Sequence, residues 1–210
     1  AVDMRLRPSG DSGVLAISLR AFARYQEEQA WTWEHQALIR ARVLVGSAVI
    51  TEQFNQVRLN VLARQRSLPI LQAEVSEMRA KMRHNHGTQT TLGGLGPNAF
   101  NSDVIFDLKQ DAGGIVDIEF MVQYAVLAWS WQYPQLVTYT DNIRILDGLG
   151  AENLLSADHV RMLQEAYKAY RAAAHRLALQ KQQGVVDGNL FTNERHAVMN
   201  VWQELGLSYL

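Results

Sequence analysis

The residues nearest the amino terminus combine one acid with two arginines in an alternating pattern. Apolar residues separate Asp3, Arg5 and Arg7, and Pro8-Ser9-Gly10 follows as a breaking turn. Alternation along a strand places these three side chains on the same face. An aspartate can bind Mg²⁺ and guanidinium groups suit bidentate contacts with phosphate, although the arginines could equally form structural pairs with Asp3 or Glu34. Because Mg²⁺ is normally shared between several carboxylates and substrate phosphates, one aspartate alone holds it poorly.

This segment resembles the last part of an active site of the nucleotidyltransferase superfamily. In that superfamily, two acids on a Gly-Ser…Asp-x-Asp turn and a third on a neighbouring strand hold Mg²⁺ and a nucleoside triphosphate. The resemblance implies that Asp3 is the third acid, a catalytic metal ligand. Gly46-Ser47 is the only Gly-Ser pair, no Asp-x-Asp occurs, and the chain starts with Ala1. We therefore expect a piece of a longer enzyme, cut just before the third acid and inactive alone.

Composition narrows the class of protein. The formal net charge is −1 with 48% hydrophobic residues, so the chain can bury a core and has no overall basic field for nucleic-acid binding. It has no cysteine, which excludes disulfides and thiolate metal sites. The longest apolar stretch, residues 115–131, contains Asp117, Glu119 and Gln123, which argues against a membrane span. We expect a cytoplasmic protein that binds neither nucleic acid nor membrane.

The remaining pattern predicts a mainly α protein. Residues 2–6 and 14–18 read as two short strands, so residues 1–18 are expected to be a β-hairpin remnant at the edge of a catalytic domain. Residues 19–210 are expected to form a helical bundle domain. Predicted helices cover about 19–45 with a break near 30–32, 51–64, 68 to the glycine at 87, 115–131, 140–148, 156–182 and 193–205. Residues 87–103 are expected to form a loop and residues 104–109 to be extended.

Three separate segments together resemble one family. Asp3–Gly10, Trp31–Arg42 and Gly113–Phe120 are similar, in this order, to segments of the bacterial glutamine synthetase adenylyltransferases. Members of that family have two nucleotidyltransferase halves, each followed by a helical bundle. The amino-terminal half removes AMP from glutamine synthetase and the carboxy-terminal half attaches it. Pro8-Ser9, the segment from Trp31 and Asp117 resemble the carboxy-terminal half, whereas Asp11-Ser12-Gly13 resembles the other.

The resemblance implies an activity and its partners. The full-length enzyme would transfer AMP from ATP, with Mg²⁺, to a tyrosine of glutamine synthetase and thereby regulate nitrogen assimilation. It also implies the PII signalling protein as a partner and glutamine as an effector. The phosphate-dependent removal of AMP by the other half remains an alternative.

Eight further side chains carry expected roles beside Asp3. Arg5, Arg7 and Lys109 are expected to contact the nucleotide, Lys109 because it lies near Gly113-Gly114, whose N–H groups could form an anion site at a helix start. Five residues are expected to support the site: Glu34, Arg40, Arg42, Asp117 and Glu119. Glu34 is expected to pair with Arg40 or Arg42. Because Asp117 and Glu119 are the only charges on a strongly apolar helix, each needs a partner.

A different class of function stays open. The chain could be a non-catalytic docking or regulatory module that binds glutamine synthetase, PII or the adjoining catalytic domain. An exposed apolar face on the first or last helix would favour that role.

Overall fold

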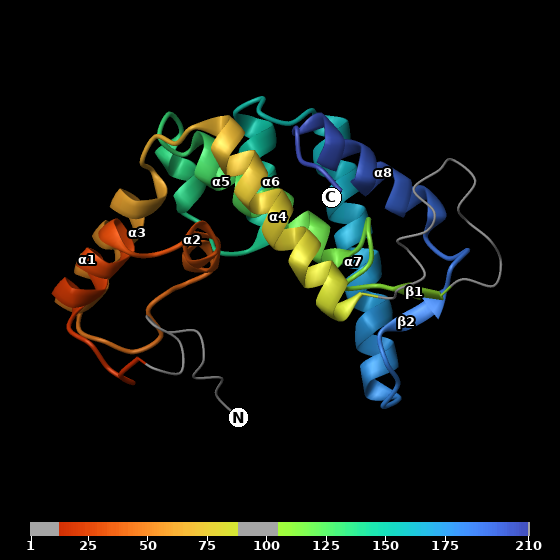
Figure 1. The fold of residues 1–210 in the computed structure, drawn as a ribbon, viewed down its shortest axis with the longest axis horizontal. Helices are drawn as coiled ribbons and strands as arrows, with labels where there is room; N and C mark the ends of the chain where they lie inside the picture. Colours follow the sequence, from red (N-terminus) through yellow and green to blue (C-terminus); the bar gives the residue numbers. More distant parts are fainter. Residues whose placement is uncertain (1–12, 88–104, 210) are drawn as a thin grey trace.

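A computed structural model describes residues 13–87 and 105–209 (Figure 1). The chain is mainly α-helical, as predicted. Its elements are α1 (Leu19–Glu28), α2 (Thr32–Ile39), α3 (Ala48–Leu62), α4 (Leu68–His86), β1 (Ile105–Asp107), α5 (Ile115–Trp129), the 3₁₀ helix η3 (Pro134–Val137), α6 (Asn142–Ala151), α7 (Ala157–Leu179), β2 (Val185–Asp187) and α8 (Thr192–Glu204).

Serine side chains begin three of the helices. The hydroxyl oxygens of Ser18, Ser47 and Ser156 accept hydrogen bonds from the N–H groups three residues later, at the starts of α1, α3 and α7. Such caps satisfy backbone donors that have no partner within the helix. The only Gly-Ser pair therefore starts a helix, which gives Ser47 a structural role.

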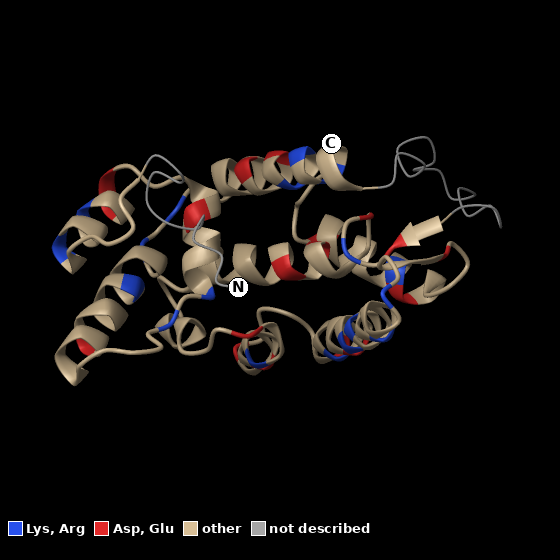
Figure 2. Cartoon of the chain, turned by 90° about the horizontal axis from the view of Figure 1, so that it is seen from below, with Lys and Arg blue, Asp and Glu red and all other residues tan. Residues whose placement is uncertain are grey.

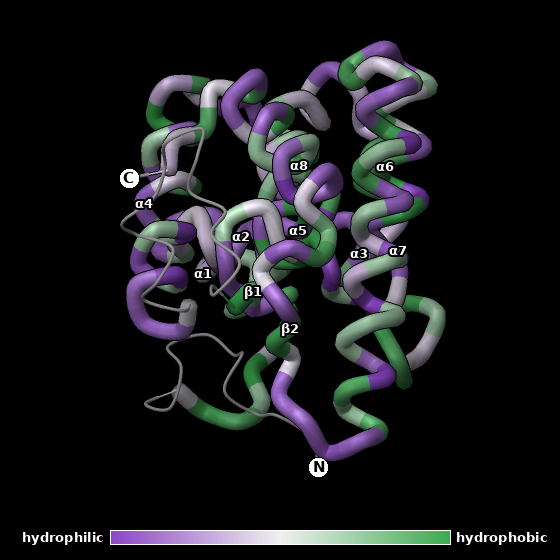
Figure 3. Tube along the Cα trace, turned by 90° about the vertical axis from the view of Figure 1, so that its right-hand side faces the viewer, coloured by the Kyte–Doolittle hydropathy of each residue, from purple (hydrophilic) through white to green (hydrophobic). Residues whose placement is uncertain are grey.

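Helix α5 is the centre of the bundle. It packs against α2, α4, α6, α7 and α8, and thirteen of its fifteen residues are buried. A helix that is apolar on nearly all sides belongs in a core. Figure 3 shows α5 between the other labelled helices, and Figure 1 shows α4 crossing it. The two ends of the molecule differ, because α1, α2 and α3 gather at one end and β1 and β2 lie at the other.

The two short strands form an antiparallel pair. Ile105 pairs with Asp187, Phe106 with Val186, and Asp107 with Val185. The extended segment predicted at residues 104–109 is confirmed over β1, whereas β2 had not been predicted. The sequence pattern of β2 is weak, because three residues are too few to show the alternation of a strand. A two-stranded ribbon is also not stable by itself and needs the helices on which it packs. Phe106 provides that anchor, since it is fully buried against Tyr170 with ring centroids 5.9 Å apart.

Some boundary predictions at the amino-terminal end were wrong. Residues 14–18 form no strand, and Val14 and Leu15 are exposed. A strand needs a partner for its backbone hydrogen bonds, and the described residues supply none here. The helix predicted to reach residue 45 ends at Ile39, after the break expected near residue 31. Residues 2–6, the other predicted strand, and residues 88–103 of the predicted loop lie outside the described residues.

Basic and acidic residues are mixed along the described helices. Figure 2 shows Lys and Arg interspersed with Asp and Glu along the helices. Within the described ranges, no helix is both long enough and apolar enough to cross a membrane.

Candidate functional site

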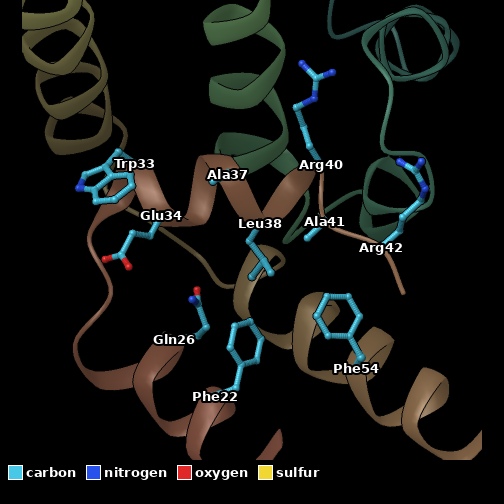
Figure 4. A pocket seen from close by; sticks show the side chains of 10 residues that line it. All are labelled: Phe22, Gln26, Trp33, Glu34, Ala37, Leu38, Arg40, Ala41, Arg42 and Phe54. Atoms are coloured by element: carbon cyan, nitrogen blue, oxygen red, sulfur yellow. The ribbon is translucent and has the colours of Figure 1, made fainter. Parts of the chain in front are cut away.

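A pocket of about 440 Å³ lies among α1, α2 and α3 (Figure 4). Pockets of this size are typical of ligand or side-chain binding sites. The rings of Phe22 and Phe54, from α1 and α3, face the Leu38 side chain of α2, with Trp33 at one edge of the view and Arg42 at the other. The lining residues are Phe22, Gln26, Trp33, Glu34, Ala37, Leu38, Arg40, Ala41, Arg42 and Phe54. Three of the predicted supporting residues, Glu34, Arg40 and Arg42, therefore share one pocket.

Glu34 fastens α1 to α2. Its Oε1 accepts a hydrogen bond from the Tyr25 hydroxyl at 2.7 Å, and its Oε2 accepts one from the Trp31 backbone N–H at 2.9 Å. A glutamate at this position of a first turn commonly satisfies the N–H group just before the helix. The predicted ion pair of Glu34 with Arg40 or Arg42 does not occur among the described residues. The prediction failed because Glu34 is occupied by its own helix start and by Tyr25.

Arg40 instead pairs with Glu119 of α5. The Nη1 atom of Arg40 lies 2.9 Å from Oε1 of Glu119, which also accepts a hydrogen bond from the Tyr167 hydroxyl at 3.2 Å. Glu119 therefore joins α2, α5 and α7. Burial, followed by the negative charge of Glu119, raises the pKa of Tyr167, so this hydroxyl keeps its proton and continues to donate. The requirement that Glu119 have a partner is confirmed.

Asp117 belongs to a different, fully buried cluster. Its carboxylate accepts from Nε of Arg79 at 2.5 Å, from the Gly113 N–H at 2.7 Å and from the Tyr209 hydroxyl at 2.8 Å. The side chains of Arg79 and Asp117 are both 0% exposed. Asp117 thus has the partners that its burial requires, and it holds α4, α5 and the carboxy-terminal segment together at a distance from the pocket lining.

Arg79 and Tyr209 were missed by reasoning from sequence. A signal for Arg79 was present, because it continues the four-residue spacing of Leu71 and Val75 along the buried side of α4. A charge on an apolar stripe at one helix, opposite a lone acid on another, indicates a buried pair. No comparable signal marked Tyr209, which lies beyond α8 in sequence.

The backbone N–H groups at the helix start around Gly113 and Gly114 already have acceptors within the chain. The Gly113 N–H donates to Asp117, and the next three N–H groups donate to the carbonyl oxygens of Asp111, Leu108 and Lys109. Gly113 has φ +79°, and a Cβ there would come within 2.8 Å of the Arg195 carbonyl oxygen. The possible anion site therefore turns out to be a structural turn that uses its own donors.

The structure does not bring Lys109 into the pocket. Lys109 is exposed directly after β1, and β1 and α2 lie toward different ends of the bundle in Figure 1. Asp3, Arg5 and Arg7 lie outside the described residues. Within residues 13–87 and 105–209, no group of three or more His, Asp or Glu side chains could hold a metal ion. Nothing among these residues fits Mg²⁺.

His35 fixes the turn between α1 and α2 close to the pocket residue Gln26. Its Nε2 lies 2.9 Å from the backbone carbonyl oxygen of Gln26, which can only accept, so Nε2 carries the proton. Nδ1, 3.5 Å from Nη2 of Arg64, is then the acceptor. Burial lowers the pKa of His35 below its ordinary value of 6.5, with the charge of Arg64 acting in the same direction and the hydrogen bond to Gln26 opposing it.

This histidine predicts a pH dependence of stability. Because its folded pKa lies below its unfolded pKa, the unfolded chain binds more protons as the pH falls, and stability is lost as the pH drops through 6.5 toward the folded value. Urea unfolding from about pH 8 to pH 5 should show this loss, since histidine titrates in this range. His35→Gln is expected to remove that part of the slope, whereas His175→Gln, at an exposed position, should keep it. An unchanged slope in His35→Gln would contradict this assignment.

Two family models match different parts of the chain. Residues 1–57 match the model described as glutamate-ammonia ligase adenylyltransferase, and residues 76–204 match the model described as GlnD PII-uridylyltransferase. The first match covers the whole pocket, and the second covers most of the bundle around α5.

Curated relatives match over nearly the whole chain. Proteins named bifunctional glutamine synthetase adenylyltransferase/adenylyl-removing enzyme are 64% identical over 206 residues in Pseudomonas aeruginosa and 64% over 207 residues in Pseudomonas syringae. These matches cover 98% and 99% of the chain and 21% of each relative. The relative from Hahella chejuensis is 46% identical over 204 residues, covering 97% of the chain and 20% of the relative.

The chain spans about a fifth of the length of these relatives. Two of its signature segments, Trp31–Arg42 and Gly113–Phe120, lie within these matches, and the third, Asp3–Gly10, lies within the match of residues 1–57 to the adenylyltransferase model. Because relatives of this one description match it from end to end, the chain belongs to the family of the bifunctional glutamine synthetase adenylyltransferase/adenylyl-removing enzymes.

Proposed function

We propose that this chain is the carboxy-terminal part of the adenylylating half of such an enzyme, acting in the cytoplasm. The observation that carries the proposal is that two of the signature segments meet in space. Arg40, in the segment Trp31–Arg42, binds Glu119, in the segment Gly113–Phe120, although 79 residues separate them. Next to this contact, Nε2 of Gln36 donates to Oε1 of Gln123 at 3.1 Å in the buried interior.

The proposed reaction joins AMP to a tyrosine of glutamine synthetase. The tyrosine oxygen attacks the α-phosphorus of ATP, the bond from that phosphorus to the β-phosphate bridging oxygen breaks, and pyrophosphate leaves as the phenolic proton is released. Asp3, with Arg5 and Arg7, is proposed to contact the Mg-bound nucleotide. Lys109 remains a predicted phosphate contact that the pocket does not support. Catalysis would consist mostly of positioning and charge neutralisation.

The described helices are proposed to hold this site in place. Arg40, which lines the pocket, forms an ion pair with Glu119 of α5, and Glu119 accepts a hydrogen bond from Tyr167 of α7. These contacts connect the pocket to α5 and α7. The Arg40 side chain is 45% exposed and that of Glu119 is 19% exposed, so the pair contributes little to folding stability. Its effect is therefore expected in activity rather than in stability.

Replacing Glu119 by glutamine in the full-length enzyme tests this role. The variant keeps an acceptor for Tyr167 but removes the charge that orients Arg40, so we expect AMP transfer to fall roughly tenfold through misplacement of Arg40. Incorporation of labelled AMP into glutamine synthetase measures the effect, and urea unfolding checks that the fold is retained. Asp141→Asn, which removes the charge of an exposed pair with Arg144 on α6, is the matched control and should leave transfer unchanged. Full activity of Glu119→Gln would show that the ion pair between Arg40 and Glu119 is not needed for AMP transfer.

A regulatory role is the second candidate function. The match of residues 76–204 to a model described as GlnD PII-uridylyltransferase favours PII as a partner of the helical part. Glutamine is retained as a proposed effector. Isothermal titration calorimetry with purified PII and the 210-residue chain tests this role. Binding would support it, and the absence of binding would argue against it.

A further inference from the structure

Arg58 of α3 is a buried cation whose hydrogen-bond acceptors are all backbone carbonyl oxygens. Its side chain belongs to a residue that is only 6% exposed. Nε donates to the carbonyl oxygen of Leu38 at 3.1 Å, and Nη1 donates to that of Val137. Nη2 donates to the carbonyl oxygens of Ile39 and, at 3.4 Å, Tyr139. Each of the three nitrogens therefore has an acceptor, and no carboxylate among the described residues is one of them.

These acceptors lie at the ends of two elements. Leu38 and Ile39 are the last two residues of α2, and the last carbonyl groups of a helix have no partner within it. Val137 is the last residue of η3, and Tyr139 follows it closely. Arg58 therefore ties the end of α2 to the connection between α5 and α6, although 79 residues separate it from Val137.

The chemistry of arginine suits this position. Burial lowers the pKa of Arg58, yet a guanidinium group keeps its charge in proteins, so the fold carries the cost of a buried cation without a counter-charge. A planar fork of five N–H groups can hold several carbonyl oxygens in fixed directions, which the single ammonium nitrogen of lysine cannot do. The gain at this position is therefore the fixed geometry of two backbone segments.

The backbone that Arg58 fixes comes directly before Arg40. Arg40 is the C-cap residue of α2, and residues 41–47 after it form no helix. Figure 4 shows the Arg40 side chain leaving the end of α2 in a direction away from the rings of Phe22 and Phe54. That side chain is held by Glu119. Arg40 is thus anchored twice, through the carbonyl groups of the two preceding residues and through its own guanidinium group.

We propose that Arg58 is a positioning residue for AMP transfer, which holds the end of α2 so that Arg40 meets Glu119. This inference rests on the proposed function, in which the pair of Arg40 and Glu119 holds the site in place. Arg58 is not one of the residues that line the pocket, so it acts on the site through the backbone of α2.

Arg66 provides a matched control. It follows α3, is half-buried, and also donates only to carbonyl oxygens, which are those of Val61, Leu62, Arg64 and Leu127. Burial lowers its pKa to about 10. None of its acceptors belongs to α2. Arg58→Lys and Arg66→Lys therefore remove the same kind of interaction and keep the charge, so that only the position of the interaction differs.

Modification by phenylglyoxal, read by mass spectrometry, reports directly on Arg40 in the 210-residue chain. Arg161, which pairs with Asp158 on α7, is the internal reference. Arg58→Lys should raise the modification of Arg40 relative to Arg161 about two- to fivefold, a small factor because exposed ion pairs are weak. Glu119→Gln, which removes the partner itself, should give the same rise, and Arg66→Lys should give none.

Three results of this labelling would overturn the proposal. They are an unchanged modification of Arg40 in Arg58→Lys, an unchanged modification in Glu119→Gln, and an equal rise in Arg66→Lys. Urea unfolding of each variant shows whether it folds. If Arg58→Lys does not fold, Arg58→Gln takes its place with the same expectations, because its amide still donates to carbonyl oxygens without burying a charge.

AMP transfer by the full-length enzyme tests the functional part of the proposal. Arg58→Lys should lower transfer roughly tenfold, as expected for Glu119→Gln, because both misplace Arg40. Added to Glu119→Gln, it should lower transfer by less than about twofold, because substitutions that act through one shared residue are not additive. Arg66→Lys should transfer AMP like the unmodified enzyme. Losses that multiply in the double variant, or a loss in Arg66→Lys equal to that in Arg58→Lys, would show that Arg58 only stabilises the fold.

The two measurements separate this inference from the proposed function, because the labelling requires no catalysis. If the unmodified full-length enzyme transfers no AMP, the proposed function fails, and the labelling still decides whether Arg58 positions Arg40. If the unmodified enzyme transfers AMP and Arg58→Lys transfers it equally well, the positioning role fails and the proposed function stands.

Discussion

Replacing Arg79 by methionine is expected to lower the free energy of unfolding by about 3–5 kcal/mol, the usual cost of leaving a buried charge without its partner. Asp117 would keep hydrogen bonds from Gly113 and Tyr209 but lose its counter-charge at 0% exposure. The loss should appear in urea unfolding of the 210-residue chain as a lower midpoint. It would loosen the contact of α4 with α5, on which the centre of the bundle depends.

Two further variants make this result specific. Arg144→Met removes an exposed pair with Asp141 and should cost no more than about 1 kcal/mol. Arg79→Met combined with Asp117→Asn should recover part of the lost stability, because the amide removes the unpaired buried charge while its oxygen can still accept from Gly113 or Tyr209. A loss below about 1 kcal/mol in Arg79→Met would show that the pair does not hold the core as the geometry indicates.

Replacing Asp3 by asparagine in the full-length enzyme is expected to lower AMP transfer by a factor on the order of 10² to 10³. Metal ions stabilise charge in such transfers by several kcal/mol, and a neutral amide is a poor substitute for a carboxylate ligand. Labelled AMP incorporated into glutamine synthetase at saturating ATP and several Mg²⁺ concentrations measures the effect. The loss should be partly relieved at high Mg²⁺, because weakened binding of the ion is its cause.

Glu27→Gln is the control for Asp3→Asn. Glu27 is an exposed acid on α1, so its replacement changes the net charge by the same amount without a proposed contact to the nucleotide. Its activity should match that of the unmodified enzyme. Normal AMP transfer by Asp3→Asn would show that Asp3 is not a metal ligand in the active site.

Much of the fold could be predicted from local features of the sequence, such as helix caps and the pattern of apolar residues. Ser18, Ser47 and Ser156 precede helices as caps, and α5 could be recognised as central because apolar residues occupy nearly every side. The prediction of a strand at residues 14–18 was wrong, because a strand needs a partner strand for its hydrogen bonds and the local sequence pattern contains no information about that partner. The pairing of β1 with β2, 80 residues apart, was missed for the same reason.

The candidate site was predictable in its members but not in its connections. Glu34, Arg40 and Arg42 were selected from one segment and do line one pocket, because they lie on α2 or directly after it. Their partners were not predictable. Glu34 binds Tyr25 of α1, and Arg40 binds Glu119 of α5, since helix packing decides which distant residue comes within reach. Asp117 was grouped with Glu119 by proximity in sequence, yet their partners lie on different helices.

The central claim is that this chain belongs to the adenylylating half, and one comparison of two activities tests it most directly. Full-length enzyme with Asp3→Asn is assayed both for attachment of AMP from ATP and for phosphate-dependent removal of AMP from modified glutamine synthetase, with the 210-residue chain assayed alongside. We predict that the variant loses attachment and keeps removal, and that the 210-residue chain performs neither. Loss of removal with attachment intact would place the chain in the other half and contradict the account.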